Sequence, residues 1–211
     1  MIRRRGAVAL AVGALLLAGC SSISPPDIKG PGRSNVKVDT PELRDLKAST
    51  KIEECTPGTA APVEDGLPSL SLPCLGGGES VDIGALRGPM VINLWASWCG
   101  PCERELPIYQ KFYAKHGEKV AVLGVDLQDN RPAAALELAK NSGVTYPQLA
   151  DPNSDLAGKK PIPAIPALPA IIFVDADGRF VVDGVPQLIF REIKSVAELE
   201  DLVEERLGIE L

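Results

Sequence analysis

The sequence has no excess of positive charge and almost no histidine. Its 22 Lys and Arg residues are outnumbered by 28 Asp and Glu residues, for a formal net charge of −6. This balance argues against nucleic-acid binding and against a polybasic membrane patch. The single histidine, His116, which we expect at a solvated helix end, cannot supply the ligands of a zinc site. We therefore expect no metal and no cofactor.

The chain also lacks internal repeats and a phosphate-binding loop. Its glycine run, Gly76-Gly77-Gly78, is not followed by the Lys-Ser/Thr ending of such a loop or by a helix. We expect a turn there. A length of 211 residues suits one domain with extensions.

No apolar run is long enough to cross a bilayer as a helix. The run Ala7–Ala18 follows Arg3-Arg4-Arg5 and ends in Leu17-Ala18-Gly19-Cys20, as an export signal does. This end resembles the bacterial lipobox, in which the cysteine is lipidated and becomes the first mature residue. The resemblance implies a lipoprotein signal peptide over residues 1–19, a lipid on Cys20 and a location on the extracytoplasmic face of the cell membrane. A plain secretory signal with a chance cysteine is the alternative.

Composition changes after this signal, and again near residue 63. Residues 20–62 are rich in Ser, Pro, Gly and charge, which predicts a lipid-anchored flexible tether with one short helical turn at Pro41–Lys47. Residues 63–211 are expected to form the folded domain. Without residues 1–19 the chain loses three of 22 Lys and Arg residues and none of 28 Asp and Glu residues, which leaves a charge of −9.

The domain alternates strand and helix patterns, and the order β-α-β-α implies parallel strands. We expect Ser195 and Glu198 to cap the last helix. The expected elements are a hairpin (67–72 with 80–83), strands at 89–96 and 120–127, helices at 99–115 and 132–142, a strand at 170–175 that returns as an antiparallel strand at 179–183, and a helix at 195–207.

Two cysteines stand where a strand is expected to end and a helix to begin. Cys99 and Cys102 lie in the stretch Trp95-Ala96-Ser97-Trp98-Cys99-Gly100-Pro101-Cys102, directly after an apolar run. A cysteine at a helix N-terminus faces unpaired backbone N–H groups and the positive end of the helix dipole. Both stabilise a thiolate, so the pair is suited to thiol–disulfide exchange.

Cys55 and Cys74 remain as an even pair in a compartment that favours disulfides. We expect a structural disulfide between them, worth about 3 kcal/mol in the chain-entropy model. The alternative is a second redox pair, or a resolving pair for Cys99.

The order of elements and the segment VINLWASWCGPCERELP resemble the TlpA/ResA-like branch of the thioredoxin fold, over about Leu67 to Leu207. The resemblance implies an α/β fold with a mixed central sheet flanked by helices and an N-terminal β-hairpin extension. It also implies a membrane-anchored, monomeric thiol–disulfide oxidoreductase of the cytochrome c biogenesis type. The implied partners are apocytochrome c or other exported protein substrates, and a CcdA/DsbD-like membrane carrier that supplies electrons.

The resemblance also assigns roles within the site. Cys99 is the expected attacking thiolate and Cys102 the expected resolving thiol. Pro169 is the expected cis-proline, with Pro166 as its rival, and Ala170 departs from the hydroxyl residue that the family often has after this proline. The surface expected to bind substrate comprises Trp98, Gly100, Pro101, Leu168 and Pro169.

Glu105 matches an acidic position of the ResA-like proteins, three residues after Cys102. If buried near the thiols, it raises their pKa values and takes part in proton transfer. The alternative is an exposed helix glutamate. Asn93 stands where thioredoxin carries a buried aspartate.

Three other functions compete with the reductase. The same dithiol could act as an oxidant that makes disulfides in exported proteins. A binding lipoprotein without enzymatic activity could use the pair as a structural disulfide or as a metal site. A peroxiredoxin-like peroxidase needs a peroxidatic cysteine in a Thr/Arg setting, which the sequence does not place.

Overall fold

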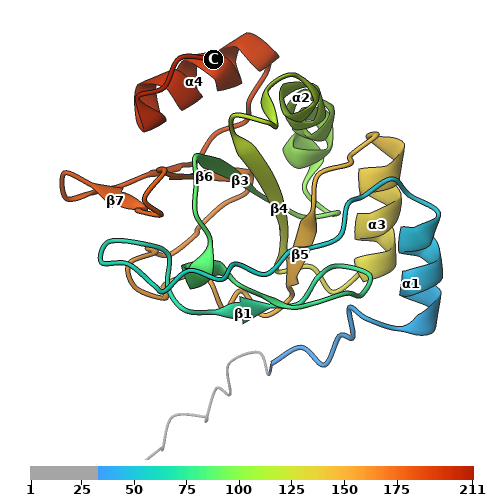
Figure 1. The fold of residues 1–211 in the computed structure, drawn as a ribbon. Coiled ribbons are helices and arrows are strands. Elements are labelled where there is room, and N and C mark those ends of the chain that lie inside the picture. Colours follow the sequence, from blue (N-terminus) through green and yellow to red (C-terminus); the bar gives the residue numbers. More distant parts are fainter. Residues whose placement is uncertain (1–32) are drawn as a thin grey trace, which may run out of the picture. The chain divides into compact units, whose positions relative to one another are not determined.

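The computed structural model describes residues 33–211, so the expected signal peptide and Cys20 lie outside the described residues. Its centre is a five-stranded sheet in the order β5-β4-β3-β6-β9 (Figure 1). Strands β3, β4 and β5 are parallel, whereas β6 and β9 run antiparallel to their neighbours, which makes the sheet mixed. The strands are β3 (Met90–Trp95), β4 (Ala121–Leu127), β5 (Gln148–Asp151), β6 (Ala170–Val174) and β9 (Leu188–Ile189).

Four α-helices accompany the sheet within the described residues, and side chains cap the N-termini of α1, α2 and α4. The Thr40 hydroxyl accepts from the Leu43 amide at the start of α1, and Ser195 accepts from the Glu198 amide at the start of α4. Gly208, at φ 63°, ends α4 in the left-handed conformation that glycine adopts freely. The helices are α1 (Pro41–Ala48), α2 (Gly100–His116), α3 (Pro132–Asn141) and α4 (Val196–Leu207).

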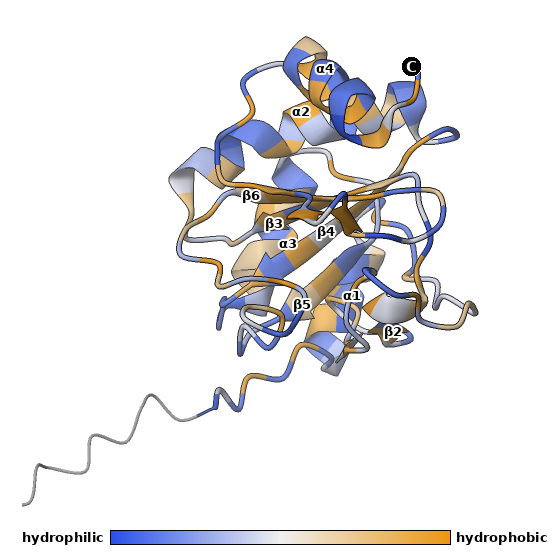
Figure 2. Ribbon diagram, turned by 90° about the vertical axis from the view of Figure 1, so that its left-hand side faces the viewer, coloured by the Kyte–Doolittle hydropathy of each residue, from blue (hydrophilic) through white to orange (hydrophobic). Residues whose placement is uncertain are grey.

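Both faces of the sheet are buried, which explains the nearly continuous apolar strands coloured orange in Figure 2. Val91 and Trp95 of β3 face a core shared with the helices. Ile92 and Leu94 of the same strand face a second core, which the N-terminal hairpin covers. Figure 1 shows α2, α3 and α4 around one side of the sheet and β1 on the other.

The expected N-terminal hairpin is present and short. β1 (Ser71–Leu72) pairs antiparallel with β2 (Val81–Asp82), and a single 3-10 turn, Ile83–Ala85, follows. Within the described residues no helix combines the length and apolar character that a membrane span needs.

The expected return strand at 179–183 is wrong. β7 (Val181–Val182) pairs with β8 (Val185–Pro186), and β6 pairs instead with β9. The chain does reverse after β6, because the Arg179 carbonyl accepts from the Asp175 amide. It then leaves the sheet, since the next two amides donate to the Asp65 carbonyl, which belongs to the segment before the hairpin.

Residues 33–62, which the sequence assigns to the tether, lie in the compact unit, which begins at Arg33. Val38, Leu43 and Ile52 are buried in the core on the helical face, and α1 packs against α3. These apolar residues are few and widely spaced among polar ones, so composition alone indicated a linker.

Candidate active site

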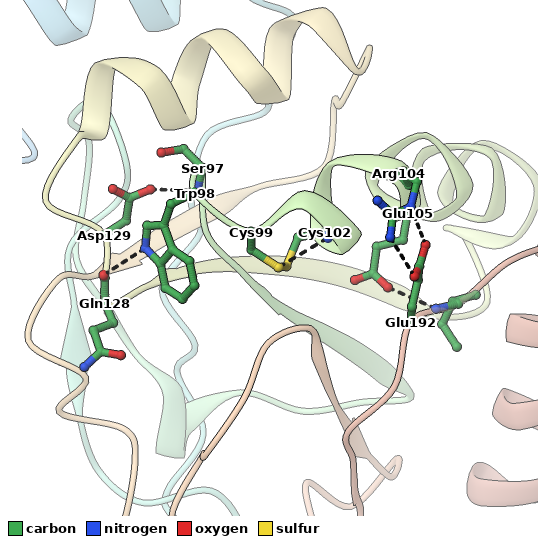
Figure 3. The surroundings of a disulfide bond; sticks show 10 residues. Ser97, Trp98, Cys99, Cys102, Arg104, Glu105, Gln128, Asp129 and Glu192 are labelled. Atoms are coloured by element: carbon green, nitrogen blue, oxygen red, sulfur yellow. Dashed lines mark hydrogen bonds and ion pairs between the residues drawn. A yellow bond between two sulfur atoms is a disulfide. The ribbon is translucent and has the colours of Figure 1, made fainter.

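Strand β3 leads directly into a dithiol at the start of α2. Cys99 is the N-cap residue of α2, and its Sγ atom accepts from the Cys102 amide at 3.3 Å. The two cysteines form a disulfide (Figure 3). A helix amide directed at the Cys99 sulfur, together with the helix dipole, stabilises a thiolate there once the disulfide is reduced.

Cys99 and Cys102 differ in their exposure to solvent. Cys102 is fully buried, whereas Cys99 retains 5% exposure and lies next to Trp98, which is 51% exposed. The Trp98 indole is held by donation from Nε1 to the Gln128 carbonyl at 3.2 Å (Figure 3). Gly100 is exposed and Pro101 half-buried. An incoming sulfur therefore meets Cys99 before Cys102.

Pro169 lies at the same edge of the sheet as the dithiol. The Leu168–Pro169 peptide bond is cis, and the bond before Pro166 is not among the cis bonds. Ala170 pairs with Leu94, so Pro169 comes beside the end of β3, from which the chain continues to Cys99. Leu168 packs against the core that contains both cysteines.

Glu105 is completely buried, so its interpretation as an exposed helix residue is wrong. Its Oε2 atom accepts from the Ile193 amide at 3.1 Å, and Oε1 has no partner within residues 33–211 (Figure 3). Burial raises the pKa of this carboxyl to about 8. Glu105 can therefore exchange a proton near neutral pH, one helical turn after Cys102.

Other buried polar groups lie around Glu105. Asn93 on β3 is fully buried, and neither of its amide atoms has a partner among the described residues. Burial raises the pKa of Tyr109, and the charges of Glu105 and Tyr146 add to the rise, which places these groups near one another. The sequence singled out Asn93 but not the tyrosines, because aromatic residues in apolar segments resemble ordinary core.

An acidic pair after β4 was not among the site residues expected from the sequence. Asp126 and Asp129 are both buried, and Asp129 contacts the loop that leads to Cys99. Two acidic residues at the carboxyl end of a buried parallel strand, level with the end of β3, were the available signal.

The remaining cysteines, Cys55 and Cys74, form a second disulfide with each other. Both are buried, and the ammonium group of Lys47 lies 3.3 Å from the Cys74 sulfur. His116 is not solvated as expected: it is buried, with its ring nitrogen 2.7 Å from Glu200. Residues 33–211 contain no group of three or more His, Cys, Asp or Glu side chains that could hold a metal ion.

A disulfide at a helix N-terminus, beside a cis-proline on a mixed sheet, defines a protein of the thioredoxin-fold class. Comparison with known sequences agrees and is more specific. The chain belongs to the AhpC/TSA family, which it matches over residues 63–182.

Individual relatives agree with this class. Thiol-disulfide oxidoreductase ResA of Bacillus thuringiensis (strain Al Hakam) is 29% identical over 106 residues, covering 49% of this chain and 59% of that protein. The chain therefore spans about three fifths of that curated relative. The structure of MTB dsbF in its mixed oxidized and reduced forms matches with a TM-score of 0.55 and 26% identity, over 68% of this chain and 98% of that one. The structure of a DsbF homologue from Corynebacterium diphtheriae matches with a TM-score of 0.50 and 25% identity, over 72% of this chain and 91% of that one.

Proposed function

We propose that this protein is a membrane-anchored thiol–disulfide oxidoreductase that reduces disulfides of exported proteins outside the cytoplasm. The observation that carries the proposal is the Cys99–Cys102 disulfide at the N-terminus of α2, with a helix amide directed at the Cys99 sulfur. A relative named thiol-disulfide oxidoreductase ResA supports the same activity.

The reaction starts from the reduced dithiol. The Cys99 thiolate attacks one sulfur of a substrate disulfide, the substrate S–S bond breaks, and the departing substrate thiolate takes up a proton. Cys102 then loses its proton and attacks the Cys99 sulfur. This second step releases the other substrate thiolate, forms the disulfide seen in the structure, and completes the transfer of two electrons to the substrate.

We assign to Glu105 the role of accepting the proton from Cys102. It lies three residues further along α2, so the two side chains share a face of the helix. With a pKa of about 8, it is partly ionised at neutral pH and can act as a general base.

Substrate binding is assigned to the surface beside Cys99. Trp98 supplies an exposed aromatic face, and Gly100 and Pro101 form the first turn of α2. Leu168 and Pro169 precede β6, beside the end of β3. An extended peptide with its disulfide at Cys99 would contact both sets of residues.

The proposed location and partners rest on sequence motifs. The apolar run ending at Cys20 supports a lipid anchor, and the ResA-like motif supports apocytochrome c as the substrate. A dithiol kept reduced in an oxidising compartment needs an electron supply, which we assign to a CcdA/DsbD-like membrane carrier.

The decisive experiment measures the rate of insulin disulfide reduction, with a small thiol as the electron donor. The wild type is expected to accelerate the reaction, and Cys99→Ser to abolish the acceleration. The matched control, Cys55→Ala with Cys74→Ala, removes the other disulfide and is expected to remain active. Equal rates for the wild type and Cys99→Ser contradict the proposal, and rapid consumption of hydrogen peroxide by the reduced protein indicates a peroxidase instead.

A further inference from the structure

The loop after β4 holds the loop that leads to Cys99. The Ser97 amide donates to Oδ2 of Asp129 at 2.7 Å, and the Trp98 indole donates to the Gln128 carbonyl (Figure 3). Arg131 adds a third contact, from its guanidinium to the Ser97 hydroxyl at 3.3 Å. Three contacts from residues within the segment 128–131 therefore fix the two residues before the nucleophile.

Asp129 is the centre of this arrangement. It is 1% exposed, and its second carboxylate oxygen accepts from the Arg131 amide at 2.9 Å, just before α3. One carboxylate thus joins the active-site loop to the start of another helix. Gln128 adopts φ 56°, a left-handed conformation uncommon for a residue other than glycine, which indicates a turn held by its contacts.

A second carboxyl, Asp126, lies against Asp129. Asp126 pairs in register with Trp95 and is 1% exposed. Burial and the neighbouring Asp129 carboxyl raise its pKa, and the effect of Asp129 places the two carboxyl groups within reach of each other. Its Oδ1 atom has no partner within the described residues. A hydrogen bond between two carboxyl groups requires a proton on one of them, because two carboxylates offer only acceptors.

The surrounding charges do not favour a second ionised carboxyl. Arg131 is the cation beside the pair, but its Nε atom is 3.9 Å from Asp129 and its side chain is 54% exposed. On the neighbouring strand β5, the carboxylate of Asp151 is engaged by the Asp155 and Leu156 amides. On the side of α2 the cysteines form a disulfide. Burial raises the pKa of Asp126 well above its usual value, and the Asp129 charge adds to the rise.

We propose that Asp126 and Asp129 are positioning residues for Cys99, which hold one proton between them and fix the Ser97–Cys99 loop through the Ser97 amide. The inference rests on the proposed function, because it concerns the nucleophile of that reaction. Protonated Asp126 donates to Asp129, and ionised Asp129 accepts from both backbone amides. Loss of the shared proton at alkaline pH puts two negative charges together, moves the loop and lowers the reactivity of Cys99.

The test measures alkylation of Cys99 by iodoacetamide in the reduced protein across pH, with the modified residue identified by mass spectrometry. Asp129→Asn is expected to slow the reaction about tenfold at pH 7, because the amide cannot accept from both backbone N–H groups. The matched control is Asp151→Asn, which changes another buried carboxylate that accepts two amides, and is expected to stay within twofold of wild type.

Asp126→Asn keeps the donor to Asp129 but cannot ionise. The rate of Cys99 alkylation in the wild type is expected to rise as the thiol ionises and then to fall about threefold at alkaline pH. In Asp126→Asn the rate is expected to rise in the same way and then to stay constant. Identical profiles for wild type and Asp126→Asn overturn the proposal, as do equal rates for Asp129→Asn and Asp151→Asn. Because no protein substrate is present, an inactive enzyme with these alkylation profiles refutes the proposed function and leaves the pair supported.

Discussion

The two disulfides of this protein join the same chemical groups in opposite settings. Cys99–Cys102 spans three positions at a helix N-terminus, next to an exposed tryptophan. Cys55–Cys74 spans 19 positions and ties the N-terminal segment to the edge of the sheet, where Cys74 bridges to Leu149. Thiol reactivity depends on what surrounds a sulfur, and stabilisation depends on the loop that a disulfide closes, so the two disulfides are expected to serve different purposes.

The two disulfides are expected to differ in how much they stabilise the fold, because they close loops of different length. The longer loop gives about 3 kcal/mol of stabilisation and the shorter one about 2 kcal/mol in the chain-entropy model. The helix N-terminus, by contrast, favours the reduced thiolate of Cys99, which offsets part of the smaller value. We therefore expect Cys55–Cys74 to stabilise the fold and Cys99–Cys102 to carry out the chemistry.

Removing the structural disulfide tests this division most strongly. Cys55→Ala with Cys74→Ala is expected to lower the free energy of unfolding by about 3 kcal/mol, because the unfolded chain regains the freedom of the closed loop. Urea denaturation of the oxidised proteins measures the change. An unchanged midpoint and slope would show that this disulfide does not stabilise the domain.

Glu105→Gln removes the proposed proton acceptor and leaves both active-site cysteines in place. Loss of the proton acceptor is expected to slow turnover on the order of 100-fold, while the variant still forms the Cys99–Cys102 disulfide. Single-turnover kinetics with a peptide disulfide should show a slow release of the mixed disulfide. A rate within a factor of two of wild type contradicts the role of Glu105.

The same variant gives a pH signature in the oxidised protein. The folded-state pKa of Glu105 is raised from 4.5 to about 8, so between these values the folded state binds the proton more tightly than the unfolded state. This contribution to stability is fully present below about pH 4.5 and is lost as pH rises through about 8. The wild-type free energy of unfolding should therefore fall more steeply over this range than that of Glu105→Gln; parallel curves would contradict the raised pKa.

Lys47→Met tests the surroundings of the structural disulfide. The Lys47 ammonium is buried and donates to the Gly77 carbonyl at 2.8 Å and to Glu54 at 2.7 Å, besides its contact with Cys74. Its removal leaves the carbonyl unpaired and is expected to cost about 1–2 kcal/mol.

The control on the same helix is Arg44→Met. Arg44 pairs with Asp39 on an exposed surface, where solvent screens the pair, so its loss is expected to destabilise the fold less than the loss of Lys47. Thermal unfolding of both variants measures the difference. Equal melting temperatures would show that the buried lysine contributes no more to stability than a surface ion pair.

Local features of the site were predictable from the sequence. The position of Cys99 depends on a strand that ends and a helix that begins within a few residues, and the Leu168-Pro169 step precedes a strongly apolar strand. Each of these signals lies within about ten consecutive residues. The pairing of Cys55 with Cys74 followed from their even number.

The features that the sequence left open or did not reveal depend on contacts between distant segments. The burial of Glu105 is completed by Ile193, 88 positions away, and the Asp129 contact with Ser97 spans 32 positions. Strand β5 is only four residues long and contains Gln148 and Asp151, so it shows neither an apolar run nor alternation. The segment 33–62 is held by its packing and by a disulfide to Cys74, neither of which composition reveals.

The division between the two disulfides is tested most directly by equilibrating the protein with thiol buffers of graded potential and identifying the alkylated cysteines by mass spectrometry. We predict that Cys99 and Cys102 become reduced together between about −270 and −120 mV, while Cys55 and Cys74 stay oxidised down to about −300 mV. Reduction of Cys55–Cys74 first, or of all four cysteines at one potential, would contradict the account.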